Sequence, residues 1–369
     1  MISDVAVRNY RSFENYHVGG LKRVNLFTGF NNSGKTSLLE AVAILASGGD
    51  ISEIWRILSQ RGEFIFLPNE ERRAFRDEAQ PDLSHLFFGH EYELDQPFMI
   101  ETEDRDFGEV KVSVTNRDKL RELNLFDKST PDGNEYLLIQ RSGRRFPEDA
   151  LIKPLSDEGK FYYSEAMSRV RRRATSENSV RQTFISPDSL SVPEMASMWD
   201  RATLEGFEAS VIDALKIIDP AVRDIVFLSG NRYSRVDKAG VVFGREGATK
   251  RFPMGSFGEG SRRLLALSLA LTSVPAGFLL VDEIDTGLHY SVLADMWKLV
   301  IATAIKNDIQ VFATTHSLDC LRGLREACDR NPEFASEVST QTIDRNLDVS
   351  IAGDATDLRS ALDLGIEVR

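Results

Sequence analysis

The sequence is poor in cysteine and in long uninterrupted apolar runs. Its two cysteines, Cys320 and Cys328, are too few for a disulfide framework and lack the spacing of metal ligands, so we expect both to be reduced and structural. Polar residues, proline and glycine interrupt the longest apolar stretch, residues 264–281, which favours a buried helix followed by a buried strand over a membrane span. The first residues do not combine a basic segment with an apolar core, so no secretion signal is expected. These absences predict a cytoplasmic protein with no membrane partner.

Basic residues are also in the minority. The 45 Lys and Arg residues stand against 57 Asp and Glu residues, for a net charge of −12, which argues against a wholly basic nucleic-acid coat. At 369 residues, 42% of them hydrophobic, the chain can bury a substantial core as one large domain or two lobes. The residues between Lys35 and Ser256 show no sustained heptad pattern. This excludes a long coiled-coil arm and predicts a globular insertion.

What the sequence does contain is a phosphate-binding loop. Residues 29–36 fit the pattern G-x-x-x-x-G-K-[ST] and lie between a strand-like run, residues 24–27, and a helix-like run, residues 37–45. The glycines let the backbone approach a triphosphate, and the N-terminus of the following helix faces its oxygens. Lys35 supplies charge for the β and γ phosphates, and the Thr36 hydroxyl is placed to ligate Mg²⁺. The predicted nucleotide-binding residues of the loop are Asn31, Asn32, Ser33, Gly34, Lys35, Thr36 and Ser37.

Two further predicted strands end in residues suited to catalysis. Residues 278–281 lead to Asp282 and Glu283, and residues 309–315 lead to His316. Asp282 would hold the Mg²⁺ shell, and Glu283 would orient or deprotonate the attacking water. A histidine after an apolar strand is often structural. Because the carboxyl ends of parallel strands meet at one edge of a sheet, however, we expect His316 to contact the γ-phosphate or the water.

The rest of the chain alternates between strands and helices. Two antiparallel strands are expected before residue 19, a helix over most of residues 51–76, and strands at 98–102, 110–114 and 136–140. Helix returns over 192–218, followed by strands at 222–228 and 239–243. The predicted domains are an ATPase core of residues 1–90 and 220–369 and an inserted β-strand and helical lobe of residues 91–219.

A third motif allows the chain to be compared with a family. Ser256, Gly258 and Glu259 open a long apolar helix, where a glycine-hinged serine presents hydroxyl, amide and helix dipole to an anion. The order of phosphate loop, S-x-G-E, apolar strand with Asp-Glu, and then Thr-His-Ser resembles the ABC-type ATPase heads of the SMC, RecF and OLD families. Residues 9–13 resemble their N-terminal strand-turn. The resemblance covers residues 1 to about 60 and 220 to 320, and covers the middle poorly.

The resemblance implies an α/β fold, a P-loop NTPase of the ABC-type head class with a mixed sheet, an antiparallel β portion and an inserted helical lobe. It implies hydrolysis of ATP with Mg²⁺. By the same resemblance Arg11 joins the nucleotide-binding residues, and Ser256, Gly258 and Glu259 form a signature motif that contacts the γ-phosphate of nucleotide on the opposite protomer. Two nucleotides would then lie between the heads of a homodimer or higher oligomer.

Three departures from the family pattern bear on the branch. Gly255 replaces the usual leucine before the signature serine, and no convincing glutamine switch follows the first helix, although Gln80 lies near the expected distance. Leu288-His289 stands where transporter ATPases carry Leu-Asp, which resembles the OLD-like branch. OLD-like ATPases often carry a Toprim nuclease, but the chain ends about fifty residues past His316, too few for that domain. The resemblance therefore implies an ATPase subunit of a two-gene bacterial anti-phage system, such as PARIS or Septu, with a separately encoded effector.

Two other functions compete with this interpretation. One is a RecF-like DNA-repair ATPase that clamps DNA directly, and the other, which the sequence favours least, is the nucleotide-binding half of a membrane transporter. A run of arginines could contact the DNA backbone. It could equally form a solvated basic face or pair with the many acidic residues. The run consists of Arg169, Arg171, Arg172 and Arg173.

Overall fold

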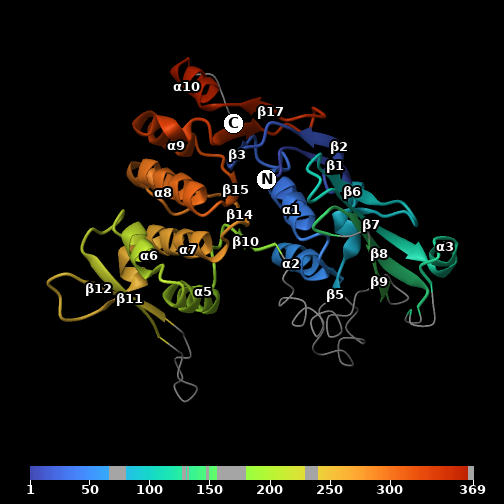
Figure 1. The fold of residues 1–369 in the computed structure, drawn as a ribbon, viewed down its shortest axis with the longest axis horizontal. Helices are drawn as coiled ribbons and strands as arrows, with labels where there is room; N and C mark the ends of the chain where they lie inside the picture. The colour runs from blue at the N-terminus through green and yellow to red at the C-terminus, as the bar shows by residue number, and fades with distance from the viewer. Residues whose placement is uncertain are drawn as a thin grey trace. The chain divides into compact units, whose positions relative to one another are not determined.

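The computed structural model describes residues 1–65, 80–126, 130, 133–146, 149–155, 180–228 and 240–364. The chain divides into two compact units (Figure 1). Residues 21–35, 181–343 and 351–369 form what we call the parallel unit, and residues 1–20, 36–180 and 344–350 form the antiparallel unit. The chain passes from the first to the second between Lys35 and Thr36, within the phosphate-loop motif.

The main sheet of the parallel unit has six strands in the order β10-β14-β15-β3-β16-β17. All neighbours run parallel except β16 and β17, which are antiparallel. Strands β3, β14 and β15 are buried along their whole length, as in parallel sheets whose two faces are both covered. Since these three are neighbours, the loops that follow them leave from one edge. The bounds are β3 (Val24–Thr28), β10 (Gln182–Ile185), β14 (Phe278–Val281), β15 (Gln310–Thr314), β16 (Val338–Thr342) and β17 (Ile351–Gly353).

The core of the parallel unit is built around α7 (Glu259–Ser273), which is buried from Arg263 to its end and contacts α5, α6 and α8. The predicted buried helix and buried strand of residues 264–281 are confirmed as α7 and β14. None of the helices in the described residues has the length and apolar character that a membrane crossing requires. The other helices are α5 (Val192–Leu204), α6 (Glu208–Leu215), α8 (Leu293–Lys306), α9 (Leu318–Arg330) and α10 (Ala355–Asp363).

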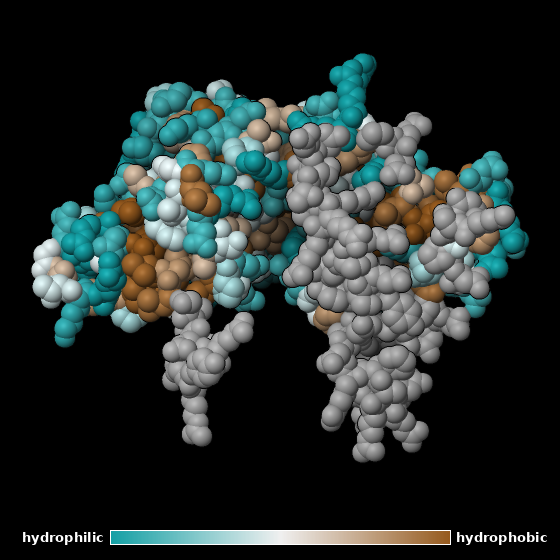
Figure 2. Space-filling model, turned by 60° about the horizontal axis from the view of Figure 1, so that its bottom comes forward, coloured by the Kyte–Doolittle hydropathy of each residue, from teal (hydrophilic) through white to brown (hydrophobic). Residues whose placement is uncertain are grey.

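A small antiparallel sheet also belongs to the parallel unit. It consists of β11 (Val222–Leu228), β12 (Gly240–Arg245) and β13 (Phe252–Pro253). Figure 2 shows apolar surface, coloured brown, on the left of the molecule where Figure 1 draws this sheet. Leu228 of β11 and Phe252 of β13 are exposed large apolar side chains.

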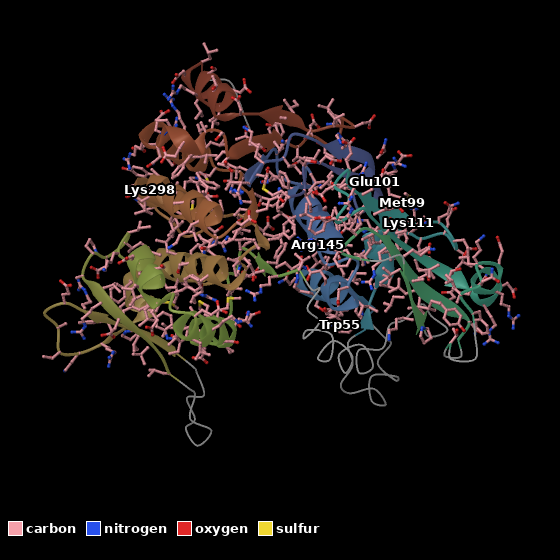
Figure 3. All side chains as sticks on the ribbon, in the orientation of Figure 1. Trp55, Met99, Glu101, Lys111, Arg145 and Lys298 are labelled. Carbon is pink, nitrogen blue, oxygen red and sulfur yellow. The ribbon has the colours of Figure 1, made fainter. Side chains whose placement is uncertain are left out.

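The antiparallel unit is organised by a second six-stranded sheet, in the order β2-β1-β6-β7-β8-β9. Its residues alternate between a buried and a more polar face: Val110 and Val112 are buried, whereas Met99, Glu101 and Lys111 lie on the other face (Figure 3). The strands are β1 (Val5–Tyr10), β2 (Phe13–Val18), β6 (Phe98–Glu101), β7 (Glu109–Asn116), β8 (Glu135–Ser142) and β9 (Asp149–Leu155). The unit also holds α1 (Lys35–Ala46) from Thr36 onward, α2 (Ile51–Arg61), α3 (Arg117–Glu122), and the short pair β4 (Phe64–Ile65) and β5 (Gln80–Pro81).

The structure confirms the predicted loop strand and following helix as β3 and α1, and the strands predicted at 98–102, 110–114, 136–140 and 222–228 as β6, β7, β8 and β11. Two helix predictions were confirmed only in part. Of the mostly helical stretch predicted over 51–76, α2 covers residues 51–61 and ends where Gly62 takes the left-handed conformation (φ 68°) that closes helices, and residues 66–76 lie outside the described residues. The helix predicted over 192–218 is broken between α5 and α6, where Gly206 has a φ of 79°.

The division into a core of residues 1–90 and 220–369 and an insertion of residues 91–219 stays a prediction. The described strands of residues 98–155 complete the sheet that β1 and β2 begin, and β10, α5 and α6 belong to the parallel unit.

Candidate functional site

The phosphate-binding loop follows β3 and ends where α1 begins. Gly29 and Gly34 have positive φ values of 137° and 100°, and a Cβ at Gly29 would lie 2.4 Å from the carbonyl oxygen of Ile343. Only glycine fits at Gly29. Lys35 Nζ donates to the carbonyl oxygens of Gly29 and Phe30, both at 2.8 Å, so the lysine side chain folds back over the loop.

The electrostatics and hydrogen bonding of this loop fit an anionic ligand. Burial lowers the pKa of Lys35, while the negative charges of Asp282 and Glu283 oppose that shift. Ser33 is 6% exposed, and its Oγ has no hydrogen-bond partner among the described residues. A buried hydroxyl without a partner costs free energy unless a ligand or water satisfies it. Ser33 is therefore placed as a phosphate contact would be.

The ends of β14 and β15 are tied together by two threonines. Thr314 Oγ1 donates to Asp282 Oδ1 at 2.5 Å and accepts from the main-chain nitrogen of Glu283 at 2.8 Å. The next residue, Thr315, donates from its Oγ1 to Asp285 Oδ1 at 2.7 Å. These bonds fix the turn that follows β14 against the end of β15, so the structure brings Asp282 and Glu283 next to the predicted His316.

The Glu283 carboxylate is partly exposed, with 40% of its side chain accessible. Its Oε1 lies 3.5 Å from His316 Nδ1, and its Oε2 accepts from Thr286 Oγ1 at 3.3 Å. A carboxylate beside an imidazole and a hydroxyl, open to solvent, can hold a water and accept its proton. By contrast Asp282, at 7% exposed, is bound through one oxygen and suited to a fixed role.

The predicted signature residues occupy the start of α7. Ser256 belongs to a 3-10 turn (Met254–Phe257), Gly258 precedes α7 with a φ of 80°, and Glu259 is the first residue of the helix. All three are exposed, whereas Phe257 packs against Phe243 with ring centroids 5.1 Å apart. The aromatic contact anchors the turn on β12 and leaves the polar residues facing outward. Gly255, whose strand-like packing the sequence left in doubt, lies within the same turn.

The residues predicted to hold Mg²⁺ offer the oxygen ligands that this ion prefers. These are the Thr36 hydroxyl and the Asp282 carboxylate. Within the described residues no group of three or more His, Cys, Asp and Glu side chains could hold a metal. In nucleotide sites Mg²⁺ usually takes one or two carboxylates and completes its shell with phosphates and water. Thr36 and Asp282 belong to different units, so their joint ligation of Mg²⁺ stays a prediction.

Arg11 takes part in a buried ion cluster of the antiparallel unit. Its Nε lies 2.8 Å from Glu40 Oε2, and its terminal nitrogens bind the two Glu63 oxygens at 2.8 and 3.0 Å. Arg61 Nε binds Glu40 Oε1 at 2.7 Å, and Arg61 also approaches Ser37 Oγ at 3.4 Å. The guanidinium of Arg11 therefore fastens the β1–β2 turn to α1. Its contact with nucleotide stays a prediction.

Other predicted residues are placed less fully. The arginine run Arg169, Arg171, Arg172 and Arg173 lies outside the described residues. Gln80 begins β5, although its neighbours were expected to be helical. His289 caps a short 3-10 helix, and its ring stacks on Tyr290 with centroids 4.2 Å apart.

Sequence reasoning did not identify the contacts that fix the turn after β14. Arg263, Thr314 and Thr315 bind main-chain or side-chain atoms of this turn. The paired threonines at the end of an apolar strand were a usable signal, because Thr hydroxyls often bond to neighbouring loops.

Comparison with known proteins was consistent with a nucleotide site. Residues 24–321 match the family described as an AAA domain, putative AbiEii toxin, type IV toxin–antitoxin system. A protein of Helicobacter pylori named ATP/GTP phosphatase is 21% identical over 373 residues, covering 91% of this chain and 90% of that protein.

Two solved structures are similar at low identity. One is the SMC head bound to the C-terminal winged-helix domain of ScpA (TM-score 0.48, 12% identity), covering 96% of this chain and 97% of that chain. The other is the SMC head with an extended coiled coil bound to the C-terminal domain of ScpA, from Pyrococcus furiosus (TM-score 0.44, 11% identity), covering 100% and 99%.

Proposed function

Because the chain belongs to this AAA domain family and is an ATPase, we propose that it is an OLD-like switch that dimerises on ATP. In this proposal the ATP-bound dimer senses infection and controls a separately encoded effector in anti-phage defence. Hydrolysis to ADP and phosphate returns the switch to its starting state.

The chemistry rests on the cluster around Glu283. Its exposed carboxylate, beside His316 and Thr286, accepts the proton of the water that attacks the γ-phosphate. Lys35 and the N-terminus of α1 offset the negative charge of the phosphates. Asp282 and Thr36 would hold Mg²⁺, which would neutralise the negative charge of the phosphates.

Dimerisation is supported by what is exposed around this edge of the sheet. Ser256 and Glu259 face outward at the start of α7, where they can contact only another molecule's nucleotide in the proposed arrangement. Phe30, in the phosphate loop, and Tyr290, after the turn that follows β14, are 69% and 66% exposed. Large apolar side chains beside a polar site are typical of a surface that a protein partner covers. The partner that we propose is a second copy of this chain.

The proposed partner is supported by the family description, which names a putative toxin of a type IV toxin–antitoxin system, a kind of system in which two proteins act together. The Leu288-His289 pair resembles the OLD-like branch and also supports a separately encoded effector. A partner encoded by the adjacent gene would supply the toxic or nuclease activity.

Light scattering tests the switch directly. The protein should be a monomer without nucleotide and a dimer with Mg²⁺ and a non-hydrolysable ATP analogue. Ser256→Arg should bind the analogue with unchanged affinity but stay monomeric, because the bulky cation blocks the contact in trans. A Ser256→Arg variant that dimerises and hydrolyses ATP like the wild type contradicts the proposal.

Co-expression tests the effector. The product of the neighbouring gene should co-purify with the wild-type protein, and Lys35→Ala, which should bind ATP more weakly, should lose protection in a plaque assay. Tight, ATP-dependent and salt-sensitive DNA binding by the isolated protein would instead favour the RecF-like alternative.

A further inference from the structure

Glu283 has a backbone conformation that its side chain does not favour. Its φ is +48°, in the left-handed region that residues other than glycine rarely enter. The main-chain nitrogen of Ile284 donates to the Thr314 carbonyl at 3.0 Å, so the chain turns back immediately after Glu283. Strained conformations of this kind persist only where surrounding contacts fix them. Besides the contacts from Thr314, several hydrogen bonds that fix this conformation come from a single residue of α7.

That residue is Arg263, in the second turn of α7. Its side chain is almost wholly buried, and one terminal nitrogen donates to the carbonyl oxygens of Asp282 and Glu283 at 2.6 and 2.7 Å. The other terminal nitrogen donates to the Ser186 carbonyl at 2.8 Å, and Nε donates to the Ile284 carbonyl at 3.4 Å. One guanidinium thus binds three consecutive carbonyls, with that of Glu283 in the middle.

The choice of acceptors is unusual for a buried cation. Burial lowers the pKa of Arg263 to about 10, and the carboxylates of Asp285, Asp282 and Glu283 are close enough to oppose that shift. A buried charge is usually paired with an opposite one. Here Asp282 and Asp285 instead accept from the two threonines, and Glu283 faces His316 and Thr286. Arg263 therefore fixes the backbone of the turn and leaves the carboxylate of Glu283 available.

We infer that Arg263 is a positioning residue for hydrolysis: by binding the carbonyls around Glu283 it holds the left-handed backbone that aims the Glu283 carboxylate at the attacking water. The inference rests on the proposed role of Glu283 as the base. Arg263 acts through Glu283 and from the buried side of the turn. Its removal should therefore change the rate of the chemical step and leave the affinity for nucleotide unchanged.

Lysine cannot replace arginine in this role, because one ammonium does not reproduce the planar fork of guanidinium donors. Arg263→Lys keeps the charge and much of the volume, so it should fold. Its kcat should fall about tenfold, as expected for one or two lost hydrogen bonds from a charged donor. The kcat of Arg263→Gln should fall further than that of Arg263→Lys.

The control is Arg330→Gln, at the end of α9 in the same unit. The Arg330 side chain is 54% exposed and pairs with Asp295 and Glu326. This variant should change kcat by less than about twofold, as surface substitutions usually do.

The decisive measurement is a double-mutant cycle in the full-length protein, with ATP hydrolysis, affinity for a non-hydrolysable ATP analogue and thermal unfolding measured for each variant. If Arg263 works through Glu283, adding Arg263→Lys to Glu283→Gln should cause no further loss of turnover, and the affinity should stay at the wild-type value in all variants. Independent, multiplying effects or a weakened affinity overturn the inference. So does an Arg263→Lys variant that turns over at the wild-type rate or does not fold.

The two ways of failing are distinguishable. If Glu283→Gln alone hydrolyses ATP normally, the role proposed for Glu283 is wrong, and the inference about Arg263 falls with it. If Glu283→Gln is inactive while Arg263→Lys is fully active, only the inference about Arg263 is wrong.

Discussion

The buried charges around Arg11 in the antiparallel unit pair with one another, whereas those around Glu283 in the parallel unit bind hydroxyl groups and main-chain carbonyls. Arg11 binds Glu40 and Glu63, and each of these charges meets an opposite one. Asp282 instead accepts from Thr314, and Arg263 donates to carbonyl oxygens. A carboxylate already bound to a cation has little left to offer a ligand or a proton. The comparison predicts that substitutions in the first cluster change stability, and that substitutions around Glu283 change catalysis.

The largest effect should come from Glu283. Replacing it with Gln leaves an amide that cannot accept a proton, so kcat should fall by about 10²–10⁴-fold, the usual contribution of a general base. Because the side chain is partly exposed, the midpoint of thermal unfolding should stay within about 2 °C of the wild type. Phosphate release and calorimetry measure the two quantities. Equal turnover in the two proteins would remove Glu283 from the mechanism.

Much of the candidate site in the parallel unit could be predicted from the sequence. The phosphate loop has fixed glycines, and the residues after β14 and β15 must meet at one edge because the strands are parallel neighbours. The buried contacts that fix the turn after β14 could not be predicted. Nothing in Arg262-Arg263 tells which arginine is buried, and the left-handed backbone of Glu283 depends on contacts from α7 and β15.

The antiparallel cluster was the harder region to predict. Arg11 has the position expected of a nucleotide ligand, but Glu63, which binds it, lies 52 residues further along the chain. Such pairing depends on how the chain folds back and leaves no local pattern. The two broken helices are different, because Gly62 and Gly206 were visible signals of a helix end.

The second largest effect tests the paired cluster. Arg11→Met leaves Glu40 and Glu63 without this cation, so the free energy of unfolding should fall by about 3–5 kcal/mol, as when one partner of a buried ion pair is removed. Arg8→Met is the control, because Arg8 pairs with Glu101 on the surface at 2.7 Å and should contribute less than about 1 kcal/mol. Denaturant titration gives both values. If Arg11→Met and Arg8→Met lowered the free energy of unfolding equally, burial would not explain a difference between the two ion pairs.

A smaller effect is expected for Lys35, which belongs to the parallel unit and donates to the main-chain carbonyls of Gly29 and Phe30. In Lys35→Ala the loop loses a cation that binds phosphate, so the dissociation constant for ATP should rise about 10–100-fold, as for a lost hydrogen bond from a charged donor. The fold should persist. Lys298→Ala, an exposed lysine of α8 (Figure 3), should bind ATP normally. Isothermal titration measures both affinities, and undiminished affinity in Lys35→Ala would count against the loop as the ATP site.

The smallest effect separates positioning from packing at Thr314. Thr314→Val keeps the shape of the side chain but removes the hydroxyl that donates to Asp282 and accepts from the Glu283 nitrogen. A buried main-chain nitrogen then lacks its partner and the turn loosens, so kcat should fall about tenfold, equivalent to about 1.4 kcal/mol. Thr272→Val is the matched control. Thr272 is also buried, but its hydroxyl donates to the Leu269 carbonyl within α7, so its loss should leave kcat unchanged. If Thr314→Val and Thr272→Val lose turnover equally, buried hydroxyls in this unit matter for packing alone. The Thr314 hydroxyl would then have no special role in positioning Glu283, and the contrast between the two units would be wrong.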